Sequence, residues 1–436
     1  MTRRFYNWAR TEHCTPASFQ RPSSEEELVA IIREARRANK QIKVIGARHS
    51  WSDIAMPCVA DCVLVSLDNM QALLEVDPAR GRVRAQAGIR LHRLNDELAT
   101  RGLALSIVGS VVEQSLAGVV STGTHGSSLV HGNIPSFVVG LRVITGTGEV
   151  LDIAEHDPLL PAARVGLGGL GIITQVSVRV EPRFQLRETT QTVSFAAALA
   201  NMQALARSAE YVKLWWLPHT DTVMVFRCER TEAAGEPSKL LAWIDRIIIN
   251  KLVFPLVLGL GRVIPRLIPP SNRLVARTYL DRAPRVGRAD RILSLAMPPR
   301  HRETEYAVPL EHAAEALRQT RALIERSGVR VNFITELRFV KGDDAWMSPA
   351  SGRDSCQLGA YMAAAPGLAG YFEAFEAAMR ALDGRPHWGK EFRATPEDIV
   401  RMYPKAEAFA AKLRELDPDG VFHGRLLTRV FPRTPD

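Results

Sequence analysis

The chain has 436 residues, which is enough for two or three domains and a large buried core. Its 46% hydrophobic and 24% charged residues form an ordinary soluble composition, which excludes long disordered stretches. The net charge of +9 comes from arginines scattered along the whole chain, so it does not outline a nucleic-acid groove and predicts no nucleic-acid partner.

The first 182 residues predict alternating helices and strands. Apolar residues follow helical spacing over 25–39, which Ser24 caps, and over 91–101. Strand patterns cover 42–45, 62–66, 83–87, 137–145, 150–153 and 172–180. A Gly-Thr-Gly hairpin turn at 146–148 joins the fourth and fifth of these strands. The first part of the chain is therefore expected to be an α/β domain.

A domain boundary is predicted at Pro182, where the pattern changes. Residues 183–405 combine alternating strands, among them 303–308 and 329–339, with an apolar insertion at 240–270. The last stretch, 406–436, contains a helix predicted at 406–416. The whole chain is thus expected to belong to the α+β class, with three successive segments.

The insertion at 240–270 is the most apolar stretch of the chain. Five charged residues interrupt it, so it falls short of the roughly 20 nearly uncharged residues that a spanning helix needs. Its cations, together with Trp243 and Phe254, suit an amphipathic surface that lies on a membrane. A helical insertion packed on its own domain explains the same pattern, and the sequence leaves both interpretations open.

Five cysteines without a CxxC pair indicate free thiols in a reducing compartment. Cys58 and Cys62 lack histidines at ligand spacing, so core packing explains them better than a metal site, and no metal is predicted. No apolar segment of a signal peptide follows the N-terminal MTRRFYNWAR. Cytoplasmic residence is expected, with membrane association left open by the insertion.

A strand that ends in a turn carries the first candidate site, in IKVIGARHSWSD at Ile42. Gly46 permits a close ligand approach, and free NH groups with the hydroxyls of Ser50 and Ser52 suit a phosphate. His49 lies in this turn. The turn is expected either to cradle a pyrophosphate or to hold a loop histidine that caps backbone carbonyls.

A second candidate site is SLAGVVSTGTHGSS, which starts at Ser115 and is built of small and hydroxyl residues. Such a segment lets a flat ligand approach the backbone, and His125 lies in its open turn, although a tightly packed loop gives the same pattern. Neither segment matches the GxGxxG fingerprint between a strand and a helix. A nicotinamide-binding Rossmann domain is therefore disfavoured.

Two later motifs bring charged residues together. In TELRFV, strand alternation places Glu336 and Arg338 on one face, where a solvent-exposed ion pair is the common alternative. In GRPHWGK, His387, Trp388 and Lys390 lie in a loop bounded by proline and glycine, a composition that often carries binding sites. Taken alone, this motif is explained better as a surface loop with an amphipathic tryptophan.

Taken together, these stretches resemble the aldonolactone oxidoreductases of the vanillyl-alcohol-oxidase flavoprotein superfamily, most closely the L-gulono-1,4-lactone and D-arabinono-1,4-lactone oxidases. The similarity covers almost the whole chain. The matching stretches are NWAR at Asn7, IKVIGARHSWSD at Ile42, AGVVSTGTH at Ala117, GLGIIT at Gly169, ELRFVKGDD at Glu336, RDSC at Arg353, GRPHWGK at Gly384 and LDPDGVF at Leu416. Their order and spacing are more specific than any single motif.

The resemblance implies an FAD-binding domain at 1–182, a substrate domain with an antiparallel sheet at 183–405, and a closing segment at 406–436 that returns to the FAD domain. It also implies a covalent bond from His49 to the flavin 8α-methyl carbon. The chain departs from the usual GGGHS or GxGHS pattern by having Ala47 and Arg48. A cation beside His49 is expected to favour the neutral imidazole that a nucleophile needs, or else to meet the pyrophosphate.

The same resemblance assigns the site residues. Glu336, Arg338, Lys390 and Ser115 are expected to be catalytic. The expected FAD contacts are Ile45, Gly46, Ala47, Arg48, His49, Ser50, Ser115, Gly118, Gly123, His125, Ser127, Ile172 and His387. Lys390 would stabilise negative charge on the reduced flavin, Arg338 would hold a substrate oxygen, and Glu336 would accept hydroxyl hydrogen bonds or assist proton removal.

The implied activity is oxidation of the C2 hydroxyl of a sugar 1,4-lactone by hydride transfer to flavin N5. The 2-keto product enolises to an ascorbate-type compound, and O2, giving H2O2, or another acceptor reoxidises the flavin. An alditol oxidase shares several of these motifs and is the closest alternative, although RDSC and the insertion favour the lactone group. A flavin-free binding protein on the same fold is the alternative from another class.

Overall fold

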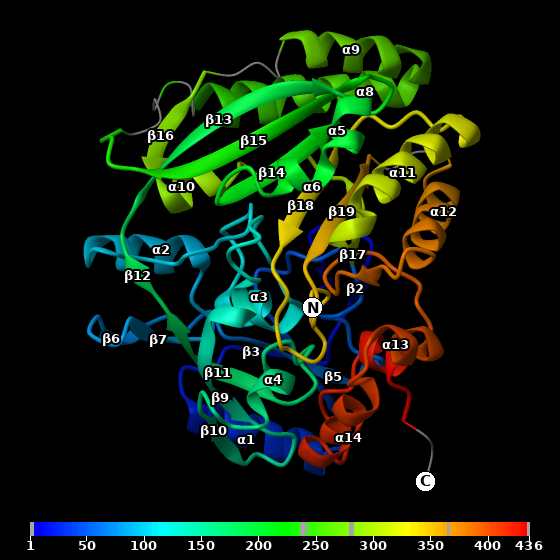
Figure 1. Cartoon of the computed structure of the whole chain (residues 1–436). Helices are drawn as coiled ribbons and strands as arrows, with labels where there is room; N and C mark the ends of the chain where they lie inside the picture. Colours follow the sequence, from blue (N-terminus) through cyan, green and yellow to red (C-terminus); the bar gives the residue numbers. More distant parts are fainter. Residues whose placement is uncertain (1–3, 236–239, 241–242, 279–282, 364–366, 434–436) are drawn as a thin grey trace.

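The computed structural model describes residues 4–235, 240, 243–278, 283–363 and 367–433. The chain forms two parts, one above the other in Figure 1, and the α+β class expected from the sequence is confirmed. The first part holds the chain up to Pro182 together with the C-terminal helices. An eight-stranded sheet with its helices forms the second part.

A parallel three-stranded sheet and an antiparallel five-stranded sheet build the first part. The three-stranded sheet has the order β3 (Ser18–Gln20), β5 (Cys62–Ser66), β4 (Gln41–Ile45). The five-stranded sheet has the order β10 (Val150–Ile153), β9 (Val138–Ile144), β11 (Ile172–Arg179), β7 (Arg82–Gln86), β6 (Leu73–Asp77). Short pairs are formed by β1 (Phe5–Tyr6) with β2 (His13–Cys14) and by β8 (Leu103–Ala104) with β12 (Glu181–Pro182).

The helices of the first part begin and end largely as the sequence predicts. α1 (Glu25–Arg37) starts at Ser24, whose side chain accepts from Glu27 N, and its first turn is acidic while its last turn is basic. It buries Leu28 and Ile32 in the core. The remaining helices are α2 (Leu91–Thr100), α3 (Leu116–Thr122), the 3-10 turn η1 (Ile134–Phe137) and α4 (Leu160–Ala163).

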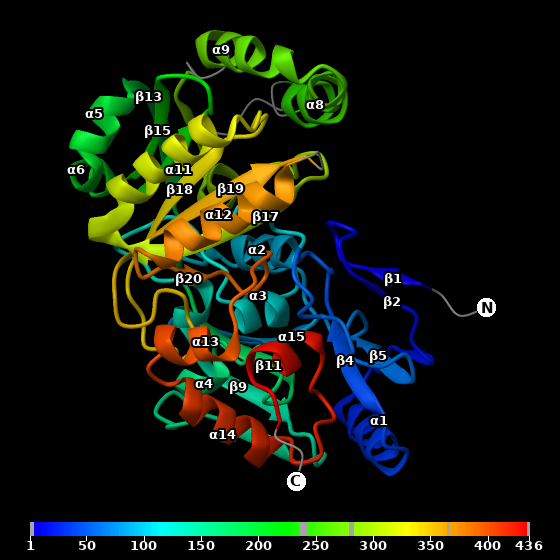
Figure 2. The same cartoon turned by 90° about the vertical axis from the view of Figure 1, so that its right-hand side faces the viewer.

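The second part is built on one antiparallel sheet of eight strands. Their order is β16 (Arg285–Arg288), β13 (Gln185–Ser194), β15 (Thr222–Thr231), β14 (Tyr211–Trp216), β18 (Thr335–Val340), β19 (Ser355–Met362), β17 (Arg302–Pro309), β20 (Arg385–Pro386). Figure 2 shows α11 (Ala313–Ser327) and α12 (Leu368–Arg380) lying along β17, β18 and β19. The smaller elements are α5 (Phe195–Ala200), α6 (Met202–Ala206), α10 (Ala289–Leu293) and η4 (Leu310–His312).

One predicted strand differs from the structure. The sequence pattern predicts a strand over 329–339, whereas β18 begins only at Thr335. Before it, Val331 N donates to His219 Nε2 and Val331 O accepts from Asn272 Nδ2. The backbone of Val331 therefore binds side chains instead of a neighbouring strand. Residues 332–334 consequently lie in an irregular segment that lines a cavity.

The insertion folds as helices at the far end of the second part (Figures 1 and 2). A π-helical stretch η2 (Ile244–Val253) runs into α8 (Phe254–Val263), followed by the turn η3 (Pro265–Leu267) and α9 (Ile268–Thr278). Within the described residues, no helix is long and apolar enough to cross a membrane.

The last helices lie against the first part, although the eight-stranded sheet separates them from it in sequence (Figure 2). They are α13 (Pro396–Met402), α14 (Ala406–Leu416) and α15 (Arg425–Val430). Backbone hydrogen bonds join Ile42 N to Val421 O at 2.7 Å and Gly146 N to Leu416 O at 2.8 Å. The closing segment thereby supports β4, which leads into the His49 turn.

Candidate active site

A cavity of about 1220 Å³ is lined by both parts of the chain. The first part contributes the turn after β4, the segment from Gly109 to His125 and the start of β11. The eight-stranded sheet contributes side chains of β14, β17, β18 and β19, and the loop at 387–390 adds a further wall. The two candidate segments from the sequence, the turn after Ile42 and the stretch from Ser115, therefore face one cavity.

The turn after β4 brings backbone and small side chains to the cavity wall. A Cβ atom added at Gly46 would collide with the Ser115 hydroxyl, so the missing side chain lets the turn and α3 approach closely. Arg48 has a positive φ of 59°, and its carbonyl accepts from Trp8 N and Ser50 N. The buried Ser50 hydroxyl has no hydrogen-bond partner, and Ser50 is one of the residues that line the cavity.

His49 projects from this turn into an aromatic environment. Its ring centroid lies 5.6 Å from that of Trp8 and 5.2 Å from that of Trp51. Burial, and after it the positive charge of Lys390, lower the pKa of His49 to about 3. The imidazole is therefore neutral, as expected from the sequence, but burial and Lys390 are responsible, while Arg48 is exposed at the cavity edge.

Two predicted cofactor contacts lie elsewhere. Gly123 ends α3 with a φ of 73°, and the space beside it is filled by Pro349 and Val165. The Ser127 hydroxyl donates to Val212 O and accepts from Phe339 N, so it ties its loop to the sheet. Neither residue lines the cavity, whereas all other predicted site residues do.

Three glutamates of the sheet face the cavity. In the strand register, Glu336 of β18 pairs with Gly359 of β19, which in turn pairs with Glu305 of β17. A Cβ at Gly359 would lie 2.6 Å from the ring of Tyr361. The missing side chain therefore leaves space for the Tyr361 ring beside Gly359. Glu303 lies two residues before Glu305 and therefore shares its face.

Glu336 is held by a set of donors. It accepts from Trp215 Nε1 at 2.8 Å, from Arg338 at 2.6 Å and from the Tyr361 hydroxyl at 3.1 Å, and Arg338 also reaches Ser110 Oγ at 2.6 Å. Burial by itself raises the pKa of Glu336, but the charges of Arg338 and Lys213 outweigh burial and lower it. Glu336 is consequently a buried, ionised carboxylate in the cavity wall.

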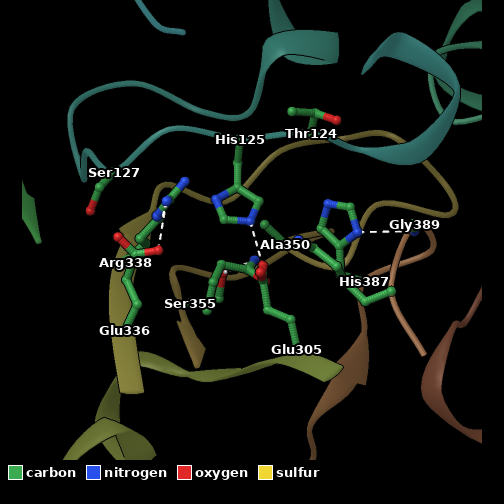
Figure 3. Close-up of polar contacts among 12 residues, drawn as sticks. Thr124, His125, Ser127, Glu305, Glu336, Arg338, Ala350, Ser355, His387 and Gly389 are labelled. Atoms are coloured by element: carbon green, nitrogen blue, oxygen red, sulfur yellow. Dashed lines mark hydrogen bonds and ion pairs between the residues drawn. The ribbon is translucent and has the colours of Figure 1, made fainter. Parts of the chain in front are cut away.

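The other two glutamates each contact a basic side chain from a distant segment. Glu303 forms an ion pair with Lys390, whose ammonium also lies 3.9 Å from the centroid of the Trp51 ring. Glu305 binds His125 Nε2 at 2.7 Å (Figure 3). Burial raises the pKa of Glu305, but the charge and hydrogen bond of His125 outweigh it, so the pKa lies well below its usual range.

Figure 3 shows His387 beside the His125–Glu305 pair. Gly389 N donates to His387 Nδ1 at 3.0 Å, and burial lowers the pKa of His387 to about 4, so this ring is neutral. Nitrogen and oxygen atoms of the three side chains lie within 4.8 Å of one another. The 2.7 Å contact between His125 and Glu305 is a hydrogen-bond distance, shorter than the roughly 3.3 Å between two ligands of a tetrahedral ion.

Comparison with known proteins decides the family. Residues 176–430 match the family model described as D-arabinono-1,4-lactone oxidase, which is more than half of the chain, and residues 16–154 match the FAD binding domain model.

The chain belongs to the D-arabinono-1,4-lactone oxidase family. The expected family and an FAD-binding domain are thereby confirmed.

Full-length relatives of this family resemble the chain from end to end. An L-gulonolactone oxidase of Scyliorhinus torazame is 32% identical and an L-gulono-1,4-lactone dehydrogenase of Mycobacterium tuberculosis is 33% identical, each with 98% of both chains covered. A D-arabinono-1,4-lactone oxidase of Eremothecium gossypii is 34% identical over 72% of this chain and 61% of its own length.

Solved structures of cholesterol oxidases share the fold of this family member. A cholesterol oxidase from B. sterolicum superimposes with a TM-score of 0.83, covering 98% of this chain and 96% of its own. Their sequences are 15% identical, so the likeness concerns the fold.

The cavity of this family member fits FAD. The close approach at Gly46, the unpartnered Ser50 hydroxyl and the neutral His49 all lie on one wall, which comes from the part matched by the FAD binding domain model. Small residues admit a flat ring system, and the free hydroxyl offers a donor to a phosphate. Charged groups of the sheet face the same space.

Several residues of the site were missed by sequence reasoning. They are Ser110, Trp215, His301, Glu303, Glu305 and Tyr361. The strand at 303–308 was predicted, and two acids at alternate positions of one strand were a usable signal that both side chains face the same way. The sequence could not predict the donors to Glu336 from β14 and β19, because they come from separate strands of the sheet.

Proposed function

We propose that the chain is an FAD-dependent oxidoreductase that oxidises the C2 hydroxyl of a sugar 1,4-lactone, with 1–182 as the FAD domain, 183–405 as the substrate domain and 406–436 as the returning segment. One observation carries the proposal: an ionised Glu336 with its Arg338 fork lines the same cavity as the His49 turn. The names of the relatives supply the substrate class.

Bound FAD would accept the hydride from the substrate carbon at its N5. Arg338 offers its donor fork to an oxygen of the lactone. The Glu336 carboxylate accepts the hydrogen bond of the reacting hydroxyl and takes its proton as the hydride leaves, because a base must be ionised before the reaction. Lys390 stabilises the negative charge that the cofactor gains, and Ser115 orients the substrate beside it.

An anaerobic titration tests this function. Purified protein is expected to be yellow and to lose its flavin absorbance when L-gulono-1,4-lactone or D-arabinono-1,4-lactone is added without oxygen. Xylitol serves as the matched polyol, because an alditol oxidase is the rival enzyme. Faster bleaching by xylitol than by either lactone would identify the protein as an alditol oxidase instead. Colourless protein that FAD cannot reconstitute would contradict any flavin-dependent activity.

We also propose that His49 is the covalent anchor of the flavin, since its neutral imidazole nitrogen is available as a nucleophile. Flavin is expected to stay with the acid-precipitated wild-type polypeptide and to be released from His49→Ala. Mass spectrometry of the tryptic peptide should show the added flavin mass on His49. His13→Ala is the control, because this exposed histidine pairs with β1 away from the cavity, and it should retain the flavin. Wild-type protein that releases all its flavin into acid would contradict the covalent bond.

The insertion is proposed to contact an anionic membrane surface. Its outer side exposes large apolar residues, with Leu256 at 72% and Val263 at 79% exposure, and the same side carries Leu252, Leu260 and Leu267. This set is called the apolar face below. The same insertion also carries exposed cations, namely Lys251, Arg262, Arg266, Arg273 and Arg277. Apolar area combined with positive charge favours a surface of anionic lipid.

Vesicle sedimentation measures this contact. Changing Leu256 and Leu260 together to serine is expected to weaken binding to phosphatidylglycerol vesicles by about tenfold or more, because each buried leucine contributes about 1.5 to 3 kcal/mol. Val400→Ser, which alters an exposed valine of α13, should bind as the wild type does. Equal sedimentation of all three proteins would refute membrane contact through the apolar face.

A further inference from the structure

A series of ring contacts leads from the insertion to His49. The ring of Phe254 at the start of α8 lies 5.0 Å from that of Phe333, which lies 5.0 Å from that of His301. From His301 the next ring is Trp51 at 5.3 Å, and Trp51 lies 5.2 Å from His49. All five side chains line the cavity, so the apolar surface helices connect by packed rings to the His49 turn.

The wall that the insertion adds to the cavity is mostly apolar, with Asn272 and Thr278 as its polar members. The described residues of η2, α8 and α9 that line it are Ile249, Val253, Phe254, Val257, Asn272, Val275 and Thr278, and none of them is charged. A sugar lactone with several hydroxyl groups finds few partners on such a wall, whereas Glu336 and Arg338 offer it many. The apolar end therefore fits a second ligand with a flat, apolar body.

We propose that this end of the cavity binds a prenylated quinone, which is the electron acceptor of the enzyme. The inference rests on the proposed lactone oxidation. Oxidation of the lactone releases two electrons and two protons, one proton as part of the hydride and one from the hydroxyl group. The quinone takes up the electron pair through the cofactor and two protons from water, and leaves as the quinol, so atoms and electrons balance.

The chemistry of the wall favours a quinone over other acceptors. A quinone ring stacks on aromatic side chains such as Phe254 and Phe333, where offset or edge contacts are favourable. Its isoprenoid tail is compatible with the apolar face of the insertion, on the outer side of the same helices. Dioxygen needs no apolar wall of this size, and a protein carrier would dock on a polar, charged rim instead.

Separate half-reactions test the inference. The holoenzyme is reduced anaerobically with lactone, or with dithionite if lactone does not bleach it, and is then mixed with a quinone carrying one isoprene unit or with air-saturated buffer. Reoxidation by the quinone is expected to saturate with concentration and to exceed the rate with O2 by at least about tenfold. Reoxidation by O2 at the same rate, or a quinone rate without saturation, would overturn the inference. Failure of lactone to reduce the flavin would count against the proposed function alone, since the dithionite arm still reports on the quinone.

A binding measurement gives an independent readout. The quinone should quench the tryptophan fluorescence of the holoenzyme, because Trp51 and Trp215 line the cavity. Phe254→Ala is expected to raise the Kd for the quinone, and the concentration that half-saturates reoxidation, by about tenfold through loss of one stacking ring. Leu274→Ala on α9 removes an exposed side chain outside the cavity and should leave both values unchanged. Equal Kd values for the two variants would refute quinone binding at this wall.

Discussion

Changing Arg338 to alanine is expected to lower kcat/KM for the lactone by about 100- to 1000-fold, the usual cost of removing one donor that acts on the reacting group. The side chain holds Glu336 at 2.6 Å and provides the cation that keeps its pKa low. Without it, Glu336 loses one of its three donors and the cation that lowers its pKa most, so this pKa should rise. Steady-state rates normalised to bound flavin measure the effect.

Arg338→Lys separates charge from geometry. A lysine retains the positive charge but lacks the planar fork, so the pKa of Glu336 should recover more than kcat/KM does. Arg187→Ala is the matched control, because this arginine is exposed on β13 of the same sheet. An Arg338→Ala protein with wild-type kinetics would show that Arg338 has no catalytic role, and it would contradict the assignment of Glu336 as the base.

Changing Gly171 to alanine is expected to lower the free energy of unfolding by about 3 kcal/mol. Gly171 has a φ of 145°, which side-chain-bearing residues rarely adopt, and an added Cβ would lie 2.7 Å from Ile144 O. The new methyl group would push β11 away from β9 directly beside Ile172, where both glycine and strand line the cavity. Urea unfolding followed by circular dichroism measures the loss, and bound flavin should fall with it.

Gly370→Ala is the control, and it is expected to change the free energy of unfolding in the opposite direction. This glycine lies in α12 with nothing within 4 Å of an added Cβ, so alanine should raise the free energy of unfolding by about 0.5 to 1 kcal/mol. Equal unfolding midpoints for both variants would show that backbone conformation at Gly171 does not limit stability.

Local patterns predicted those parts of the molecule whose causes are local. The cap at Ser24 set the start of α1, and the apolar run before Gly46 set β4. The pairing of Glu336 with Arg338 was also predicted, because two residues two positions apart on one strand share a face.

The rest of the site depends on contacts between distant segments. Glu305 meets His125, 180 positions earlier, and Glu303 meets Lys390 from a late loop. In the sequence, an acidic residue at an alternate position of a strand cannot be distinguished from one that faces solvent, because its partner is not known. The strand predicted at 329–339 was too long at its start because His219 and Asn272 take the backbone groups there. Sequence pattern carries no information about such long-range partners.

The support of the His49 turn by late segments has a consequence for biosynthesis. Trp51 N donates to Gly389 O at 2.8 Å, Ser52 Oγ donates to Trp388 O at 2.7 Å, and Ile42 N binds Val421 O. A nascent chain still emerging from the ribosome lacks these supports even after its entire N-terminal half has been made. Incomplete chains are therefore expected to bind no flavin and to remain colourless, so yellow colour should mark molecules whose translation and folding have both finished.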